Sequence, residues 1–161
     1  MQAPESLIAF SLDDVLAALE VRLELEEAID KLPLTKALEQ CLLFAQANNL
    51  ADLAQFVTQE LDGYNVSPPS DRIVYLSYFD NGGQPINGLD QYSSYPLVTG
   101  IRKLELHLKN GLSLMLPKQI MNFLSQVAGR EVDTGHISPS EINKCLESIR
   151  TLTIQKLKSK I

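Results

Sequence analysis

Four polar residues near the middle of the chain have the types and the spacing that could support chemistry, namely Glu60, Asp62, Tyr64 and Arg72. They converge if the chain turns back over the end of the helix that precedes them. A carboxylate and a fixed guanidinium in a cleft can hold a phosphate or carboxylate ligand. The same residues can instead form a buried corner, in which Glu60 pairs with Arg72 and Tyr64 buries its ring and hydrogen-bonds its hydroxyl. The pattern favours the buried corner over the ligand site.

The rest of the sequence offers few other groups for catalysis or metal binding. The two histidines, His107 and His136, are far apart and lie in no zinc-binding pattern. The sequence contains no nucleophile elbow, phosphate-cradling loop or dinucleotide fingerprint. Cys41 and Cys145 fall on apolar helical faces, which is typical of small buried side chains. We therefore predict no catalytic residue, no metal ion and no cofactor, and the sequence favours a non-enzymatic role.

The composition is that of a folded domain whose charge is unevenly distributed. The chain has 161 residues, of which 45% are hydrophobic, and a formal net charge of −6. Residues 1–62 hold 12 acidic and 3 basic side chains, which sum to −9, and residues 63–161 hold 8 acidic and 11 basic ones, which sum to +3. The acidic balance argues against a general affinity for nucleic acid. No apolar run approaches the ~20 residues of a membrane span and no leader-like segment is present, so we expect a cytoplasmic protein.

The elements that must position the four polar residues begin with helices over 11–63. Ser11, with the two acids that follow it, indicates the start of a first helix, and Pro33 ends that helix. Two more helices are predicted over 34–47 and 50–61 from apolar residues at helical spacing. The glycine that follows stops the third helix, so the candidate residues are expected at a helix end.

An extended ribbon is predicted directly after this helical region. Residues 72–79 are rich in β-branched and aromatic side chains, which is typical of a strand. Asp80-Asn81-Gly82-Gly83 indicates a turn, and residues 84–89 can return as a partner strand. A two-stranded ribbon is marginal by itself, so it must pack on helices or gain a third strand.

Residues 99–116 fit two patterns equally well. Alternating leucines on either side of Asn110-Gly111 are typical of a hairpin. Thr99 as an N-cap, followed by apolar residues at helical spacing, instead predicts a helix that the Asn-Gly pair stops. Periodicity alone leaves both interpretations open.

Two more helices are predicted in the C-terminal part of the chain. Pro117 suits the first turn of a helix that ends at Gly129, and a polar loop is expected after it. Ser138-Pro139-Ser140-Glu141 combines an N-cap serine, a proline at the first helical position and a glutamate at capping-box distance. It predicts the start of a last helix, which reaches about Lys158 and whose final lysines suit the negative end of the helix dipole.

With these residues located, the sequence resembles the AbiTii domain family. The family's Glu-Leu-x-Gly-Tyr motif corresponds to Glu60-Leu61-Asp62-Gly63-Tyr64, and an arginine that leads a strand follows it after a proline-containing link, here Arg72. Three other segments are similar to recurring segments of the family, namely 38–53, 100–105 and 114–117. Glu60, Leu61, Gly63, Tyr64 and Arg72 are therefore expected to form a motif that is either structural or ligand-binding.

The resemblance also implies a fold and a biological setting. It favours a helix over 100–109 and an extended stretch over 112–116, and it implies a single domain over 1–161. Phe56 stands where tryptophan is common in the family, and Asp71 where tyrosine often precedes the arginine, which weakens the case for an aromatic platform. The setting that the resemblance implies is bacterial abortive infection, a defence against phage.

Together these observations predict an α+β fold, mostly helical, in which a helical bundle covers a small antiparallel β-ribbon over 72–89, with C-terminal helices within 100–158. The expected function is a non-enzymatic interaction or sensor domain in phage defence, with a protein partner or homo-oligomer formed through amphipathic helices. One alternative is an enzyme or toxin whose site uses Glu60, Tyr64 and Arg72. Another is a nucleic-acid-binding module that uses the basic C-terminal helix.

Overall fold

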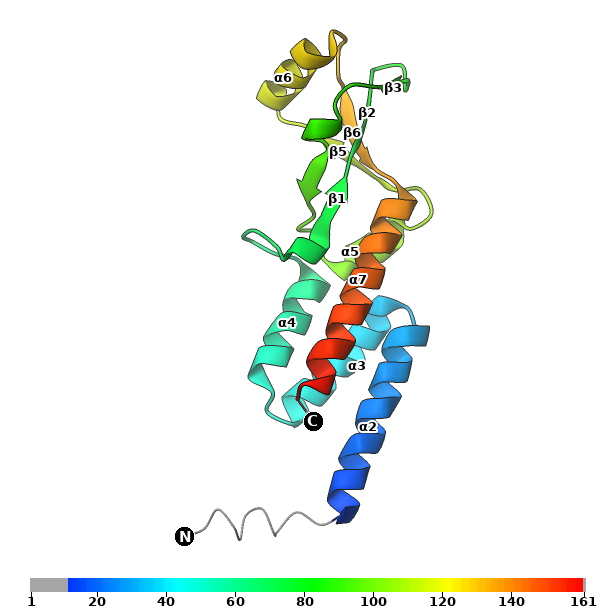
Figure 1. Cartoon of the computed structure of the whole chain (residues 1–161), viewed down its shortest axis with the longest axis vertical. Coiled ribbons are helices and arrows are strands. Elements are labelled where there is room, and N and C mark those ends of the chain that lie inside the picture. Colours follow the sequence, from blue (N-terminus) through cyan, green and yellow to red (C-terminus); the bar gives the residue numbers. More distant parts are fainter. Residues whose placement is uncertain (1–11, 161) are drawn as a thin grey trace. The chain divides into compact units, whose positions relative to one another are not determined.

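The computed structural model describes residues 12–160, and the chain divides into two compact units (Figure 1). The first, here called the helical unit, comprises the described residues up to Thr58 together with those from Arg150 onward. The second, here called the mixed unit, comprises Gln59–Ile149. The fold is α+β and mostly helical, as predicted. The single domain expected over 1–161 stays a prediction.

The helical unit is built from α2 (Leu12–Lys31), α3 (Leu34–Ala47), most of α4 (Ala51–Asp62) and the last turns of α7 (Pro139–Lys158). Pro33 lies between α2 and α3, where its missing donor and fixed φ end one helix and open the next. The helices predicted over 34–47 and 50–61 are confirmed to within one residue. The N-cap predicted at Ser11 lies outside the described residues. No helix in the described range 12–160 is both long enough and apolar enough to span a membrane.

The core of the helical unit lies along facing stripes of its helices. Arg150 connects α7 to the end of α2 by hydrogen bonds. Its Nη1 donates one of 2.9 Å to the carbonyl of Leu32 and another to the carbonyl of Ile29. These carbonyls lie at the end of α2, where backbone acceptors have no partner within the helix. The buried apolar side chains of the unit are Leu25, Ile29, Leu34, Ala37, Leu38, Cys41, Ala45, Leu53, Val57 and Leu157.

Two small antiparallel sheets make up the β-structure of the mixed unit. One sheet pairs β1 (Ile73–Tyr75) with β4 (Ser94–Pro96). The other has the strand order β3-β2-β6-β5, and Figure 1 shows these four strands together. Its strands are β2 (Ser77–Phe79), β3 (Pro85–Ile86), β5 (Leu112–Met115) and β6 (Thr134–Ile137).

The single strand predicted over 72–79 is wrong in one respect, because the structure breaks it at Leu76. The backbone N–H of Leu76 donates to the carbonyl of Ser93 at 2.8 Å, and the chain then passes from the first sheet to the second. The predicted ribbon is confirmed in the pairing of β2 with β3. In the turn that joins them, the Asp80 carboxylate accepts backbone hydrogen bonds of 2.9 Å from Gln84 and Gly82. These bonds, the one from Gln84 first, lower the pKa of Asp80.

The ribbon gains further strands from a segment that the sequence predicts as a polar loop. That prediction is wrong for β6, which pairs with β2 on one side and β5 on the other. Local propensity could not reveal β6, because Gly135 and His136 interrupt the apolar pattern. A Cβ at Gly135 would meet the Leu76 side chain at 3.4 Å and the Tyr78 ring at 3.5 Å, which are ordinary contact distances, so space does not require a glycine there. Pairing on both sides therefore makes β6 a strand.

The family resemblance chose correctly between the two interpretations of 99–116. α5 (Ile101–Leu104) runs into a 3-10 turn over Glu105–His107, and the extended stretch after it is β5. Gly100, rather than the predicted Thr99, is the N-cap residue of α5.

The two C-terminal helices begin and end where the sequence predicts. α6 (Lys118–Ala128) starts after Pro117 and stops at Gly129, whose φ of 69° is left-handed. The Ser138 Oγ accepts a hydrogen bond of 3.2 Å from the Glu141 N–H at the start of α7. The Glu141 carboxylate accepts the N–H of Tyr75 at 2.9 Å, which ties the first turn of α7 to β1.

Candidate functional site

A fully buried arginine stands at the centre of the predicted motif. Arg72 ends a 3-10 turn over Ser70–Arg72 and is 0% exposed. Its Nε donates to the Glu60 Oε1 at 2.9 Å, and its Nη2 donates to the backbone carbonyl of Glu60 at 3.0 Å. Its Nη1 donates to the carbonyls of Leu97 at 2.9 Å and Thr99 at 2.5 Å. The guanidinium thus joins the end of α4 to the segment between β4 and α5.

Glu60 is held in the last turn of α4, where a helix exposes carbonyls that have no partner within it. Arg72 binds one of these carbonyls and also the Glu60 side chain, so it acts as a cap for the helix. The positive guanidinium also lies at the negative end of the helix dipole. Glu60 itself is 1% exposed, which makes this a buried and hydrogen-bonded ion pair.

Tyr64 completes the cluster from the other side of the glutamate. Its hydroxyl donates a hydrogen bond to the Glu60 Oε2, so the carboxylate accepts hydrogen bonds on both oxygens. Its ring lies 5.0 Å from the Arg72 guanidinium carbon, within the range of a cation–π contact. Burial and the neighbouring Glu60 raise the pKa of Tyr64 well above its ordinary value. Tyr64 therefore serves as a hydrogen-bond donor at any physiological pH.

Two glycines allow the backbone of this corner to close. Gly63 follows α4 with φ of 107°, which side chains rarely adopt, and forms a β-bridge with Thr99. Gly100 lies against the end of α4, where an added Cβ would meet the Leu61 carbonyl oxygen at 2.2 Å. The Tyr64 N–H also donates to the carbonyl of Val98 at 2.9 Å. Gly63, the glycine of the motif, is therefore required by its left-handed φ, and Gly100 is required by the close approach of the two backbones.

The other two residues of the motif have different surroundings. Leu61 is 1% exposed and belongs to the apolar core. Asp62, which the sequence grouped with the polar cluster, faces solvent and pairs with Arg102 across 3.1 Å. The expected convergence is therefore confirmed for Glu60, Tyr64 and Arg72 and is wrong for Asp62. The role of these residues, structural or ligand-binding, stays a prediction.

Sequence reasoning missed the segment that closes the cluster. The carbonyls of Leu97 and Thr99 are acceptors for Arg72, and Gly100 makes room for the end of α4. Backbone acceptors carry no sequence signature, because any residue can supply a carbonyl. The glycine in Thr99-Gly100 was the available signal, since an isolated glycine beside an extended stretch often marks a close backbone approach.

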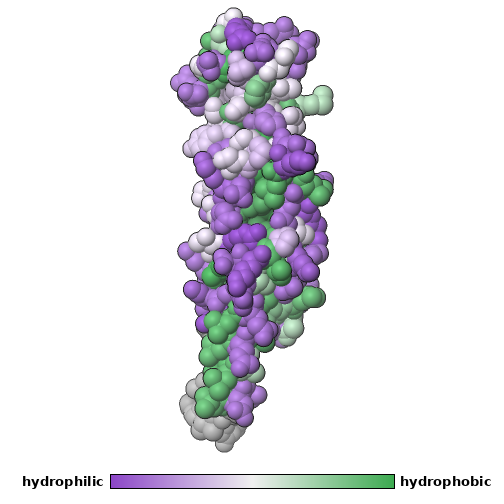
Figure 2. Space-filling view, turned by 90° about the vertical axis from the view of Figure 1, so that its right-hand side faces the viewer, coloured by the Kyte–Doolittle hydropathy of each residue, from purple (hydrophilic) through white to green (hydrophobic). Residues whose placement is uncertain are grey.

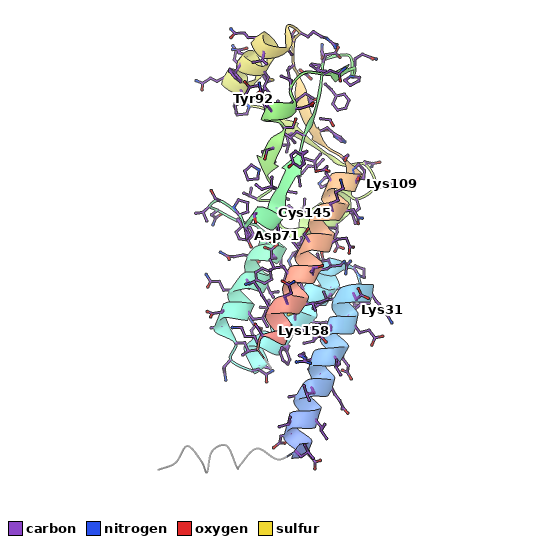
Figure 3. The ribbon with its side chains drawn as sticks, viewed as in Figure 1. Lys31, Asp71, Tyr92, Lys109, Cys145 and Lys158 are labelled. Carbon is purple, nitrogen blue, oxygen red and sulfur yellow. The ribbon has the colours of Figure 1, made fainter. Side chains whose placement is uncertain are left out.

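A small cavity is lined by Asp71 and Ile73, the two residues on either side of Arg72 in the sequence. Asp71, Tyr75, Glu141 and Cys145 are among its lining residues, and its volume is about 140 Å³. Figure 3 shows Asp71 and Cys145 near each other, on the turn before β1 and on α7. Pockets for small molecules usually measure about 300–1,000 Å³. This cavity is therefore smaller than a usual ligand site.

A second cavity of the mixed unit is larger and mostly apolar, at about 490 Å³. Tyr92, labelled in Figure 3, is among its lining residues, and its ring meets Phe123 of α6 edge to face with centroids 5.1 Å apart. The lining includes the tyrosines Tyr78 and Tyr95 and carries no carboxylate, histidine or basic side chain.

The thiols and histidines are the remaining side chains whose chemistry the sequence singled out. Burial raises the pKa of Cys41 to about 11, and burial first among several causes raises the pKa of Cys145 to about 11, so both thiols stay protonated. The His136 Nδ1 lies 3.0 Å from the Ser113 Oγ on the neighbouring strand. Within residues 12–160 no three His, Cys, Asp or Glu side chains are grouped as metal ligands.

Replacing Tyr64 with phenylalanine is expected to lower the free energy of unfolding by about 1.5–3 kcal/mol, the contribution of a hydrogen bond to a charged group. The substitution keeps the ring over Arg72 and removes the donor to Glu60. The measurement is the urea midpoint at constant slope. Tyr75→Phe is the matched control, because Tyr75 is 59% exposed and should change stability by no more than about 0.5 kcal/mol. Equal midpoints for the two variants would contradict the role given to the Tyr64 hydroxyl.

The sequence of the chain was compared with models of known protein families. The model of the family described as AbiTii matches residues 24–156, which include the whole motif and most of both units. The resemblance read from the motif is thereby confirmed. Searches of curated proteins and of solved structures give no match.

Proposed function

The chain belongs to the AbiTii family, and from that premise we propose that it is a non-enzymatic interaction or sensor module of a bacterial abortive-infection defence. The family's name associates it with abortive infection, in which phage infection is countered at the level of the infected cell. The observation that carries the non-enzymatic part of the proposal is the burial of the Glu60–Arg72 pair, at 1% and 0% exposure.

The burial of this pair supports a structural use of the family motif. Arg72 donates to one carboxylate oxygen and three backbone carbonyls, and Tyr64 donates to the second carboxylate oxygen. A ligand phosphate or carboxylate would need these donors and would have to displace acceptors of the fold. The motif residues therefore support the corner between α4 and the strands, and contacts with other molecules fall to exposed surfaces.

An enzyme or toxin with its site at Glu60, Tyr64 and Arg72 is the less supported alternative. Catalysis requires a reacting atom within about 3 Å of the working groups. The cavity that borders the motif measures about 140 Å³, and its lining includes neither Glu60 nor Arg72. An enzyme of this kind would have to open the corner before each turnover.

A nucleic-acid-binding role for the C-terminal helix is also less supported. Lys156 lies with its Nζ 4.9 Å from the centre of the Phe56 ring, and Lys158 lies 4.0 Å from the Glu26 carboxylate. Part of the positive charge of α7 is thus used inside the helical unit. A steep fall of binding to double-stranded DNA with added salt would indicate the nucleic-acid role instead.

The proposed role in defence is tested by phage challenge of cells that carry the complete locus, the locus without this chain, or the locus with the chain restored on a plasmid. We expect plaque formation to rise when the chain is removed and to fall again on restoration. Equal plaque formation with and without the chain would contradict a role in defence.

A further inference from the structure

The first half of α2 carries an apolar stripe of largely exposed leucines. Leu12 is 72% exposed, Leu23 is 55% exposed and Leu16 is 47% exposed, and Leu19 between them is half-buried. The buried residues of this helix, Leu25 and Ile29, both lie in its second half. Exposed apolar residues that occur singly need no explanation, but a contiguous stripe of leucines on one helix marks a contact surface.

The spacing of the four leucines is that of a helix–helix seam. They follow one another at intervals of four, three and four residues, which is the a/d spacing of a heptad pattern. At about 100° per residue they fall within about 60° of the helix circumference. They therefore form one narrow line along the helix, wide enough for one partner helix.

Four carboxylates lie directly beside this line. On the same helical geometry Asp13, Glu20, Glu24 and Glu27 fall within the next 60° or so of the circumference, all on one side of the leucines. All four are exposed, and within residues 12–160 the structure gives a basic partner only to Glu27, through Lys31 at 2.8 Å. Figure 2 shows a column of hydrophobic residues with hydrophilic ones beside it in the lower part of the molecule, where α2 runs in Figure 1.

The charges decide what kind of partner suits the seam. In an antiparallel pairing a second copy of α2 would bring its own carboxylates against the same flank, and like charges brought together across an interface are strongly unfavourable. Opposite charges at the flanking positions would complement the carboxylates and speed association. We infer that the leucine stripe of α2, Leu12, Leu16, Leu19 and Leu23, binds an amphipathic helix of a partner protein that carries lysine or arginine beside its apolar face. This inference rests on the proposed role as an interaction module and names the class of partner.

The test uses the full chain and two synthetic helical peptides of about three heptads, with leucine at the a and d positions. One peptide carries lysine at the flanking positions and the other carries glutamate. We expect fluorescence anisotropy to show binding of the lysine peptide at least about tenfold tighter than that of the glutamate peptide, with the difference shrinking as salt is added. Equal affinities for the two peptides would overturn the inference.

Variants of the chain make this test specific to the stripe. Leu16→Asp/Leu23→Asp should abolish binding of the lysine peptide, whereas Leu43→Asp should not, because Leu43 is a comparably exposed leucine on α3 outside the stripe. Glu20→Lys/Glu24→Lys should reverse the preference, so that the glutamate peptide binds more tightly. Helix content of each variant is checked by circular dichroism, and retention of lysine-peptide binding by the Leu16→Asp/Leu23→Asp chain would contradict the assignment.

Two results would assign the stripe to another occupant and so overturn the inference. Sedimentation that shows a dimer of the wild-type chain, lost in Leu16→Asp/Leu23→Asp, would identify a second copy. Peptide binding that appears only after deletion of residues 1–11 would identify the chain's own N-terminal segment. Neither result bears on the proposed role in defence, which depends on the phage challenge of the locus with and without the chain.

Discussion

Replacing Arg72 with alanine is expected to lower the free energy of unfolding by about 3–5 kcal/mol, the usual effect of removing one partner of a buried ion pair. The loss leaves the Glu60 carboxylate buried without its charge partner, and it leaves the carbonyls of Leu97 and Thr99 without their donor. Small domains have a total stability of about 5–15 kcal/mol, so the expected loss is a large fraction of the total. Urea unfolding followed by circular dichroism measures the effect.

A neighbouring arginine gives the matched control for this prediction. Arg102 pairs with Asp62 of the same motif at 3.1 Å, but the two side chains are 43% and 60% exposed. Exposed ion pairs contribute about 0–1 kcal/mol, so Arg102→Ala should leave the unfolding midpoint almost unchanged. An Arg72→Ala protein as stable as Arg102→Ala would show that the buried pair is not what holds the corner.

Gly100→Ala is expected to destabilise the protein by about 3 kcal/mol or more, at the upper end of the range for overpacking. The added Cβ would lie 2.2 Å from the Leu61 carbonyl oxygen and 2.6 Å from the Asp62 carbonyl carbon, both of which are backbone atoms of α4. Gly100 itself has φ of −69°, which any residue adopts, so the requirement is purely one of space. The clash can be relieved only by moving the helix end away from the Thr99 segment, which would also stretch the hydrogen bonds of Arg72.

Gly82→Ala is the control for this substitution. An added Cβ at Gly82 meets only the Asp80 carboxylate oxygen, at an ordinary contact distance of 3.5 Å. Its stability should therefore stay within about 0.5 kcal/mol of the wild type. The comparison is made by thermal unfolding of both variants, and a Gly100→Ala protein that melts together with Gly82→Ala would contradict the close approach.

The sequence predicted the helices well because their signals are local. Pro33, Gly63, Gly129 and the Ser138 cap each end or begin a helix through their own backbone chemistry, and the structure has helix ends at all four places. The strands were predicted less well, since the pairing of β6 depends on neighbours far along the chain. The break at Leu76 could not be predicted either. A run of β-branched and aromatic residues indicates a strand, but it does not indicate that the two ends of the run belong to different sheets.

The candidate site was predictable in its side chains and not in its backbone partners. Glu60, Tyr64 and Arg72 were found because charged and aromatic residues at a helix end are conspicuous in a sequence. The sequence showed that these three side chains could converge but did not require it. It also grouped Asp62 with them, although Asp62 faces solvent. The carbonyls of Leu97 and Thr99 both accept hydrogen bonds from the Arg72 Nη1, and no property of these two side chains indicates that role.

The central claim is that the Glu60–Arg72 pair supports the fold and does not act on a ligand. Its most direct test is a parallel measurement of thermal unfolding and phage protection for Glu60→Gln in the otherwise complete locus. Glutamine keeps the length of the side chain but removes the charge that pairs with Arg72, and it replaces one of the two accepting carboxylate oxygens with an NH2 donor. We predict a lower Tm and a protection that falls only as far as the fraction of folded protein falls. Loss of protection at an unchanged Tm would contradict the claim and assign the pair a direct functional role.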